Sequence, residues 1–132
     1  MTGLDTNVLV RFLVGDDRQQ CNHAMKVIDD AAQRGDACFI GVVVFCELVW
    51  VLESAYGYRR HEIASVLEKL LSARQFLIEQ KDTVYLAVQD YWQGKGDFAD
   101  YLIGRINHAA GCDFTVTFDK TLKGDSHFRL LQ

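Results

Sequence analysis

The apolar positions of this chain follow two different spacings, and each spacing predicts a different kind of element. Short continuous apolar runs predict buried strands, whereas apolar residues three and four positions apart predict helices. The runs place a strand that ends near residue 5 and strands over 38–42, 76–79 and 114–118, with an edge strand over 127–131. The helical spacing covers about 18–34, 45–56, 63–71, 84–91 and 99–106.

The order of these elements predicts the fold class. Strands and helices alternate along the chain, and each strand is brief and apolar. This order favours an α/β fold in which a parallel sheet of four or five strands is flanked by helices on both faces. The 132 residues suffice for one hydrophobic core, so we expect a single domain over residues 1–132.

Composition and charge narrow the range of functions. Hydrophobic residues make up 49% and charged residues 24% of the chain, as in soluble globular proteins, and proline is absent. The formal net charge of −4 argues against a protein that binds nucleic acid by bulk positive charge.

The cysteines and the N-terminal residues bear on the compartment. Four cysteines occur, none in a C-x-x-C pair, and three of them lie in apolar surroundings. Such cysteines are typical of an intracellular protein with reduced, mostly buried thiols. The first residues include Asp5 and no basic segment, and the longest uncharged apolar run, 37–46, is too short to span a bilayer. We therefore expect a cytoplasmic protein.

Two acids follow predicted strands. Asp5 stands at the end of the first strand, and Asp119 comes directly after the run that ends at Phe118. Because ligands of parallel α/β sheets bind beyond the carboxyl ends of the strands, both carboxylates would face one crevice. Each acid taken alone can instead be a turn residue or a helix N-cap, roles that aspartate fills well.

Glu47 is the only charged residue between Ala37 and Leu52. Glutamate is seldom buried without a partner or a metal, and an ionised carboxylate in apolar surroundings is costly. The alternative is a place on a solvated face of its helix. The apolar stripe of that helix favours a functional role for Glu47.

A further acidic stretch opens the helix over 99–106. Asp97 follows Gly94-Lys95-Gly96 at a position suited to an N-cap, and Asp100 falls in the first turn, where the helix dipole favours an acid. The cap accounts fully for Asp97. Asp100 lies beside the apolar stripe of this helix, which points to a further role.

Four carboxylates in one crevice require a cation. Two like charges about 4 Å apart repel by roughly 4 kcal/mol at an effective dielectric constant of about 20. No cysteine or histidine accompanies the acids at a metal-binding spacing, so every ligand would be an oxygen, which favours Mg²⁺ or Mn²⁺ over zinc. Such a metal, without a serine or cysteine nucleophile, indicates hydrolysis by phosphoryl transfer, in which the metal generates hydroxide and stabilises the leaving oxygen.

The acidic segments resemble those of PIN domains, and within that family those of VapC-type toxins of bacterial toxin–antitoxin pairs. The similarity rests on Leu4-Asp5-Thr6-Asn7-Val8-Leu9, Phe45-Cys46-Glu47-Leu48-Val49-Trp50-Val51-Leu52, Asp97-Phe98-Ala99-Asp100-Tyr101-Leu102-Ile103 and Thr117-Phe118-Asp119-Lys120. The resemblance implies a parallel sheet between helices and Mg²⁺- or Mn²⁺-dependent endoribonuclease activity. It also implies two partners, an antitoxin that occupies the active-site groove and a second copy in a homodimer.

The resemblance also assigns residues. The acids at the family's catalytic and metal-binding positions are Asp5, Glu47, Asp100 and Asp119. The supporting positions are matched by Asp97, Thr6, Asn7 and Thr117. Val43, one helical turn before Glu47, departs from the serine or threonine that many relatives carry, which removes one hydrogen bond but no ligand.

Other classes of protein compete with this interpretation. A phosphotransfer receiver domain also gathers acids at strand ends, but it needs an adjacent acidic pair after its first strand, where only Asp5 stands. A dehalogenase-like phosphatase needs a second aspartate at position 7, which is Asn7. A catalytically idle RNA-binding PIN module would have little use for four retained acids.

Trp50 is a candidate for partner binding. It points away from the apolar stripe of the helix over 45–56, and tryptophan is enriched at interface hot spots. The alternative is that a second layer of the same domain, such as the helix over 63–71, covers it.

Overall fold

The structure, a computed structural model, describes residues 1–132. Its elements in chain order are β1 (Thr2–Gly3), α1 (Thr6–Val14), α2 (Arg18–Gln33), β2 (Cys38–Ile40), α3 (Val42–Ser54), α4 (Arg60–Ser72), β3 (Phe76–Ile78), α5 (Lys81–Gln93), α6 (Phe98–Ala109), β4 (Thr115–Thr117), the 3-10 helix η1 (Lys120–Leu122) and β5 (Phe128–Leu130). Every predicted strand and helix is present, with bounds that differ by a few residues.

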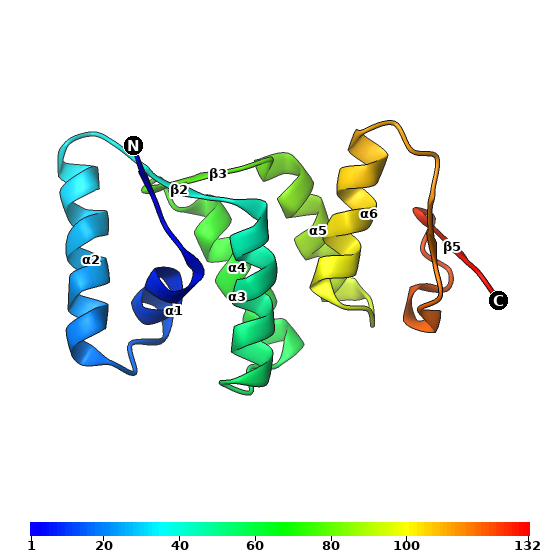
Figure 1. Ribbon diagram of the computed structural model, residues 1–132, viewed down its shortest axis with the longest axis horizontal. Coiled ribbons are helices and arrows are strands. Elements are labelled where there is room, and N and C mark those ends of the chain that lie inside the picture. The colour runs from blue at the N-terminus through cyan, green and yellow to red at the C-terminus, as the bar shows by residue number, and fades with distance from the viewer.

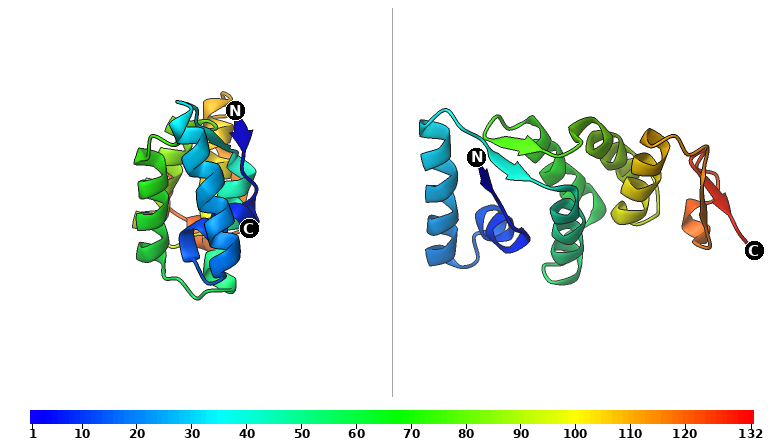
Figure 2. Two further views of the ribbon diagram at one scale, coloured as in Figure 1. Left: turned by 90° about the vertical axis from the view of Figure 1, so that its left-hand side faces the viewer. Right: turned by 45° about the horizontal axis from the view of Figure 1, so that its top comes forward.

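All strand pairs are parallel, but they form two sheets. The first sheet has the order β1-β2-β3, and the second consists of β4 and β5. The predicted α/β class with parallel strands is confirmed, while the strands do not join into one sheet. The two sheets lie towards opposite ends of an elongated molecule (Figure 1, Figure 2).

The strand over 114–118 is not the buried strand that its apolar run predicts. Val116 is 53% exposed, and Phe118, directly after β4, is 75% exposed. The physical reason is the alternation of side chains along the strand: Thr115 faces α6, where Asn107 donates to its hydroxyl, so Val116 lies on the opposite face. The strand predicted over 38–42 ends at Ile40, because Gly41 is the N-cap of α3 and Val42 begins that helix.

The main core lies among the helices and the three-stranded sheet. There α1 packs against α2 and α3, and α4 packs against β3 and α5. The last long helix, α6, is locked to α5 by Arg105, which donates to both carboxylate oxygens of Asp90 at 2.7 and 2.8 Å. The rings of Tyr91 and Phe98 meet edge to face in the same contact.

The C-terminal unit, residues 115–130, is attached to the rest of the molecule through α6 and the loop before it. Phe128 packs over Gly104, where an added Cβ would lie 2.6 Å from the ring. Asn107 Nδ2 donates to Thr115 Oγ1 at 3.0 Å. Leu122 is buried against Gly96, whose missing Cβ leaves room for it. These contacts therefore fix the unit to α6 and to the loop before α6.

No helix combines the length and the apolar character that a membrane crossing needs. The four cysteines are free, and Cys38 is buried, Cys21 and Cys46 are half-buried and Cys112 is exposed. The expectation of mostly buried thiols is therefore wrong. Burial raises the pKa of the Cys38 and Cys46 thiols.

Candidate active site

Asp5, Thr6 and Glu47 form the first acidic group of the candidate site. Asp5 is the N-cap of α1, and its Oδ1 accepts a hydrogen bond from the Val8 N–H at 2.9 Å. Thr6 Oγ1 donates to Glu47 Oε1 at 2.7 Å. Asp5 is thus a cap, as its alternative interpretation predicts, and its second carboxylate oxygen makes no protein hydrogen bond.

Glu47 lies on the exposed side of α3. The solvated-face alternative is the one that the structure shows. Val43 and Trp50, one helical turn before and after Glu47, are 68% and 70% exposed. The exposed side of α3 is therefore itself apolar, which is why the sequence around Glu47 looks like that of a buried helix.

Asp97, Asp100 and Asp119 form the second acidic group. Burial and then the charges of Asp97 and Asp119 raise the pKa of Asp100, whose carboxyl is within hydrogen-bond reach of Asp119. The Thr121 hydroxyl and N–H donate to Asp119 Oδ1 at 2.7 and 2.9 Å and lower the pKa of Asp119. Asp100 therefore protonates more readily than Asp119.

The remaining predicted supporting residues differ in their contacts. Thr117 Oγ1 accepts a hydrogen bond from the Asp119 N–H at 3.0 Å and so fixes the turn that follows β4. Asp97 stands at the N-cap of α6, but its side chain makes no capping hydrogen bond, which corrects the expectation that capping explains this residue. Asn7 is exposed in the first turn of α1.

Arg60 positions the loop that precedes Asp97, and sequence analysis missed it. Its Nη1 donates to the carbonyls of Tyr91 and Gly96 at 2.9 Å each, and its guanidinium lies 4.2 Å from the centroid of the Tyr91 ring. The Tyr101 hydroxyl accepts from the Gly96 N–H at 3.1 Å. No pattern in the sequence links Arg60 with Gly96, because the two residues are far apart in the chain. The only sequence feature that marks this loop is its pair of glycines, Gly94 and Gly96.

The two acidic groups do not meet within one chain. No three Asp, Glu, His or Cys side chains come close enough together to hold a metal ion. Asp5 follows β1 of the first sheet, whereas Asp119 follows β4 of the second. Carboxylate oxygens are the donors that Mg²⁺ and Mn²⁺ prefer, so the donor chemistry fits a divalent metal, but a single chain does not bring the donors to one point. The ligand assignment stays a prediction.

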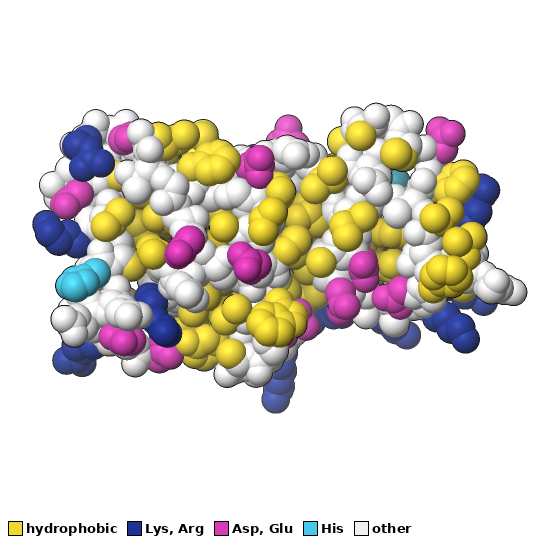
Figure 3. Space-filling view, viewed as in Figure 1, with side chains coloured by type: hydrophobic (Ala, Val, Ile, Leu, Met, Phe, Trp, Pro, Cys, Tyr) yellow, Lys and Arg dark blue, Asp and Glu magenta, His cyan; other side chains and the backbone are white.

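A cleft of about 360 Å³ lies between α3 and the start of α6. Its lining residues are Cys46, Val49, Trp50, Glu53, Ser54, Asp97, Phe98 and Ala99. Trp50 is exposed there, so it points away from the core as predicted, and the alternative of a covering layer is wrong. Figure 3 shows acidic side chains at separate places along this face, with hydrophobic side chains between them.

The strand order and the acids after β1 and β4 define an α/β domain with acidic strand ends. The chain belongs to the PIN domain family, whose model matches residues 4–124. It is similar to a protein of Aquifex aeolicus (strain VF5) named VapC ribonuclease, with 30% identity over 120 residues that cover 91% of this chain and 88% of that protein. The family match decides against the receiver and phosphatase alternatives.

Proposed function

We propose that this protein is an endoribonuclease that cuts RNA phosphodiester bonds with water, and that it is the toxin of a toxin–antitoxin pair. PIN family membership and the relative named VapC ribonuclease support the proposal. The observation that carries the proposal is that the four family acids, Asp5, Glu47, Asp100 and Asp119, have no basic side chain as a partner. None of them forms a salt bridge to a lysine or arginine, so all four carboxylates are available to a cation.

The cation of this proposal is Mg²⁺ or Mn²⁺, which the four carboxylates would hold when the two acidic groups are brought together. When bound, such a metal supplies an activated water and stabilises the leaving oxygen. The chain's own residues hold the ligands in place: Thr6 binds Glu47, and Thr121 binds Asp119. Thr117 fixes the backbone that carries Asp119. Asp97 has a supporting role through its charge, which raises the pKa of Asp100.

The partners of this proposal are the RNA substrate, an antitoxin protein and a second copy of the chain. The cleft beside Trp50 is an apolar surface next to the acids, and it suits the segment of an antitoxin that blocks access to them.

The experiment is an RNA cleavage assay with MgCl₂ or MnCl₂, and with EDTA. We expect cleavage that EDTA abolishes and that Asp5→Asn or Asp119→Asn abolishes without loss of the fold. The matched control is Asp17→Asn, because Asp17 caps α2 through the Gln20 N–H at 3.0 Å just as Asp5 caps α1. RNA binding without cleavage would instead identify an idle binding module, and cleavage by the Asp5 and Asp119 variants at the parent rate would contradict the proposal.

A further inference from the structure

The loop over residues 94–97 determines where α6 begins. The Gly96 N–H donates to the Tyr101 hydroxyl at 3.1 Å, and Tyr101 follows Asp100 in α6. The N–H groups of Asp100 and Tyr101 both donate to the carbonyl of Asp97, at 3.1 and 3.2 Å, and so form the first turn of the helix. A displacement of this loop would therefore displace Asp97 and Asp100 together.

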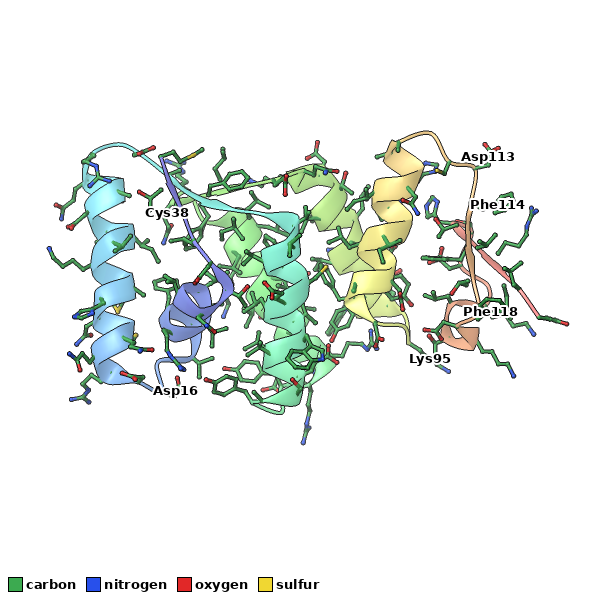
Figure 4. All side chains as sticks on the ribbon, in the orientation of Figure 1. Asp16, Cys38, Lys95, Asp113, Phe114 and Phe118 are labelled. Atoms are coloured by element: carbon green, nitrogen blue, oxygen red, sulfur yellow. The ribbon has the colours of Figure 1, made fainter.

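The same loop also contacts the short helix that follows β4. Gly96 is buried, and an added Cβ there would lie 2.7 Å from Leu122 in η1, whose N-cap is Asp119. Figure 4 shows Lys95 of this loop at the end of α6 opposite to Asp113. All three members of the second acidic group are thus attached to one stretch of four residues.

Arg60, the first residue of α4, holds this loop from outside. Its Nη1 donates to the carbonyls of Tyr91 and Gly96 at 2.9 Å each, so one nitrogen joins the end of α5 to the loop. The guanidinium lies 4.2 Å from the centroid of the Tyr91 ring, and that ring is buried. No other residue outside α5 and α6 forms a hydrogen bond with the loop, so the position of the loop depends on Arg60.

The charge of Arg60 acts at the cleft between α3 and the start of α6. Trp50 and Glu53 of α3 form one wall of this cleft of about 360 Å³, and Asp97 with Phe98 forms the other. Burial and then the charge of Asp97 raise the pKa of Glu53, whereas the charge of Arg60 lowers it. The attraction of Arg60 for these acids offsets the repulsion between them, which favours a narrow cleft.

The width of this cleft bears on the candidate active site. Glu47 of the first acidic group stands on α3, the same helix as Glu53, whereas Asp97 and Asp100 of the second group stand at the start of α6. A residue that fixes the start of α6 relative to α3 therefore fixes part of the distance between the two acidic groups.

We propose that Arg60 is a positioning residue for RNA cleavage, which acts by holding the loop over 94–97, and with it Asp97 and Asp100, at a fixed place relative to Glu47. The proposal rests on the proposed function, because these acids belong to the same site. In this role Arg60 contacts neither the RNA nor a metal. A lysine would keep the charge but would lack the planar guanidinium that stacks on Tyr91.

The first test is chemical rescue in the RNA cleavage assay. Arg60→Ala should lower kcat about tenfold or more and leave KM within about twofold, because RNA still binds while the acids are displaced. Guanidinium chloride at millimolar concentration, far below that which unfolds proteins, should restore part of kcat, because the free cation can take the place of the side chain. Sodium chloride at the same ionic strength should restore none.

Arg105→Ala is the matched control. Arg105 also joins α5 to α6, through hydrogen bonds of 2.7 and 2.8 Å to Asp90, but it forms no hydrogen bond with the loop. This variant should lose thermal stability, whereas the kcat of the folded chain should stay within about twofold of the wild type and should not respond to guanidinium.

The second test measures the loop without any activity. The N–H groups of Asp100 and Tyr101 should exchange with deuterium faster in Arg60→Ala, and guanidinium should slow this exchange again. The N–H groups within α2 should keep their rates. If Arg60→Ala does not fold, Arg60→Lys replaces it in both tests, where we expect a smaller fall in kcat, an unchanged KM and a smaller rise in exchange.

An unchanged kcat in Arg60→Ala, or in Arg60→Lys where the alanine variant does not fold, would overturn the proposal, and so would unchanged exchange at Asp100 and Tyr101. An equal loss of kcat in Arg105→Ala, or a loss in Arg60→Ala that guanidinium leaves as it is, would assign Arg60 a structural role only and overturn the proposal as well. A wild type that cleaves no RNA would overturn the proposed function, while the exchange test would still decide whether Arg60 holds the start of α6.

Discussion

The Thr6 hydroxyl donates a 2.7 Å hydrogen bond to the Glu47 carboxylate and so joins the first turn of α1 to the exposed side of α3. Removing this bond tests whether the orientation of Glu47 matters. Thr6→Val should lower RNA cleavage about tenfold, since hydrogen bonds to charged groups contribute about 1.5–3 kcal/mol. The free energy of unfolding should change by less than about 0.5 kcal/mol, as for exposed contacts. Thr6→Ser keeps the hydroxyl and should retain activity; equal loss in both variants would contradict the role.

Asp100 is the acid whose removal should stabilise the fold. Burial and its acidic neighbours raise its pKa, so the folded state binds its proton more tightly than the unfolded state does. At low pH the carboxyl is protonated in both states, so the destabilising effect is absent. The effect grows as the pH rises through the unfolded-state pKa and then the folded-state pKa of Asp100. Asp100→Asn should therefore raise the free energy of unfolding near neutral pH by about 0.5 kcal/mol, measured without divalent metal.

Asp119→Asn is the comparison for Asp100→Asn. Because Thr121 stabilises the Asp119 carboxylate and lowers its pKa, the same substitution there should give no such gain. A larger gain in the free energy of unfolding for Asp119→Asn than for Asp100→Asn would show that the unfavourable charge is not that of Asp100.

The contact of Asp16 with Tyr56 and Arg11 should be visible in acid unfolding. The Tyr56 hydroxyl donates to Asp16 Oδ2 at 2.8 Å, Arg11 Nη1 lies 3.1 Å from Oδ1, and the pKa of Asp16 is lowered. A carboxyl whose pKa is lower in the folded state stabilises the fold at pH values above its unfolded-state pKa of about 3.9. This stabilisation is lost as the pH falls through the folded-state pKa. The stability difference between wild type and Asp16→Asn should thus be constant above about pH 5 and shrink below about pH 4. Asp30→Asn, which breaks the exposed pair with Lys26, is the control and should show a smaller difference.

Gly104 should determine whether the C-terminal unit stays attached to α6. Gly104→Ala places a methyl group against Phe128, an overpacking that costs about 1–3 kcal/mol. Hydrogen exchange should speed up over residues 115–130 and stay unchanged in α1–α3. Adding Phe128→Leu should restore part of the protection. Faster exchange throughout the chain would show instead that the whole fold depends on this contact.

Trp50 should contribute to binding rather than to stability. Trp50→Ala should weaken antitoxin binding or dimerisation by about 2 kcal/mol or more while the chain stays folded, since Trp50 is 70% exposed. Titration and sedimentation measure both effects. Trp92→Ala on α5 is the matched control, because Trp92 is 50% exposed. Equal effects of the two substitutions would rule out a specific role for Trp50.

Local patterns were sufficient to predict the helices and the acids that stand at their starts. The apolar stripe of α3 and the glycines before Asp97 are patterns of residues that are close together in the sequence. The structure has the expected elements at both places. The exposure of Glu47 could not be predicted from the sequence. Its neighbours on the helix, Val43 and Trp50, are apolar, and an apolar residue type does not show whether a side chain faces solvent or the core.

Strand pairing was harder to predict, because it joins residues that are far apart in the chain. An apolar run such as 114–118 shows that a strand forms but not which strand lies beside it. The same pattern is compatible with one sheet of five strands and with the two sheets found here. For that reason the sequence placed Asp5 and Asp119 in one crevice, while the contacts of a single chain keep them apart.

In the second half of the molecule, elements pack mainly against their neighbours in the chain: α4 against α5, α5 against α6, and β4 against β5. Such low contact order allows each element to find its partner as soon as both have left the ribosome. Residues 60–109 can therefore become compact during synthesis, before the C-terminal unit exists. Phe128 reaches Gly104 only after residues 110–128 have been made, so the contact of the C-terminal unit with α6 forms later than the contacts within residues 60–109.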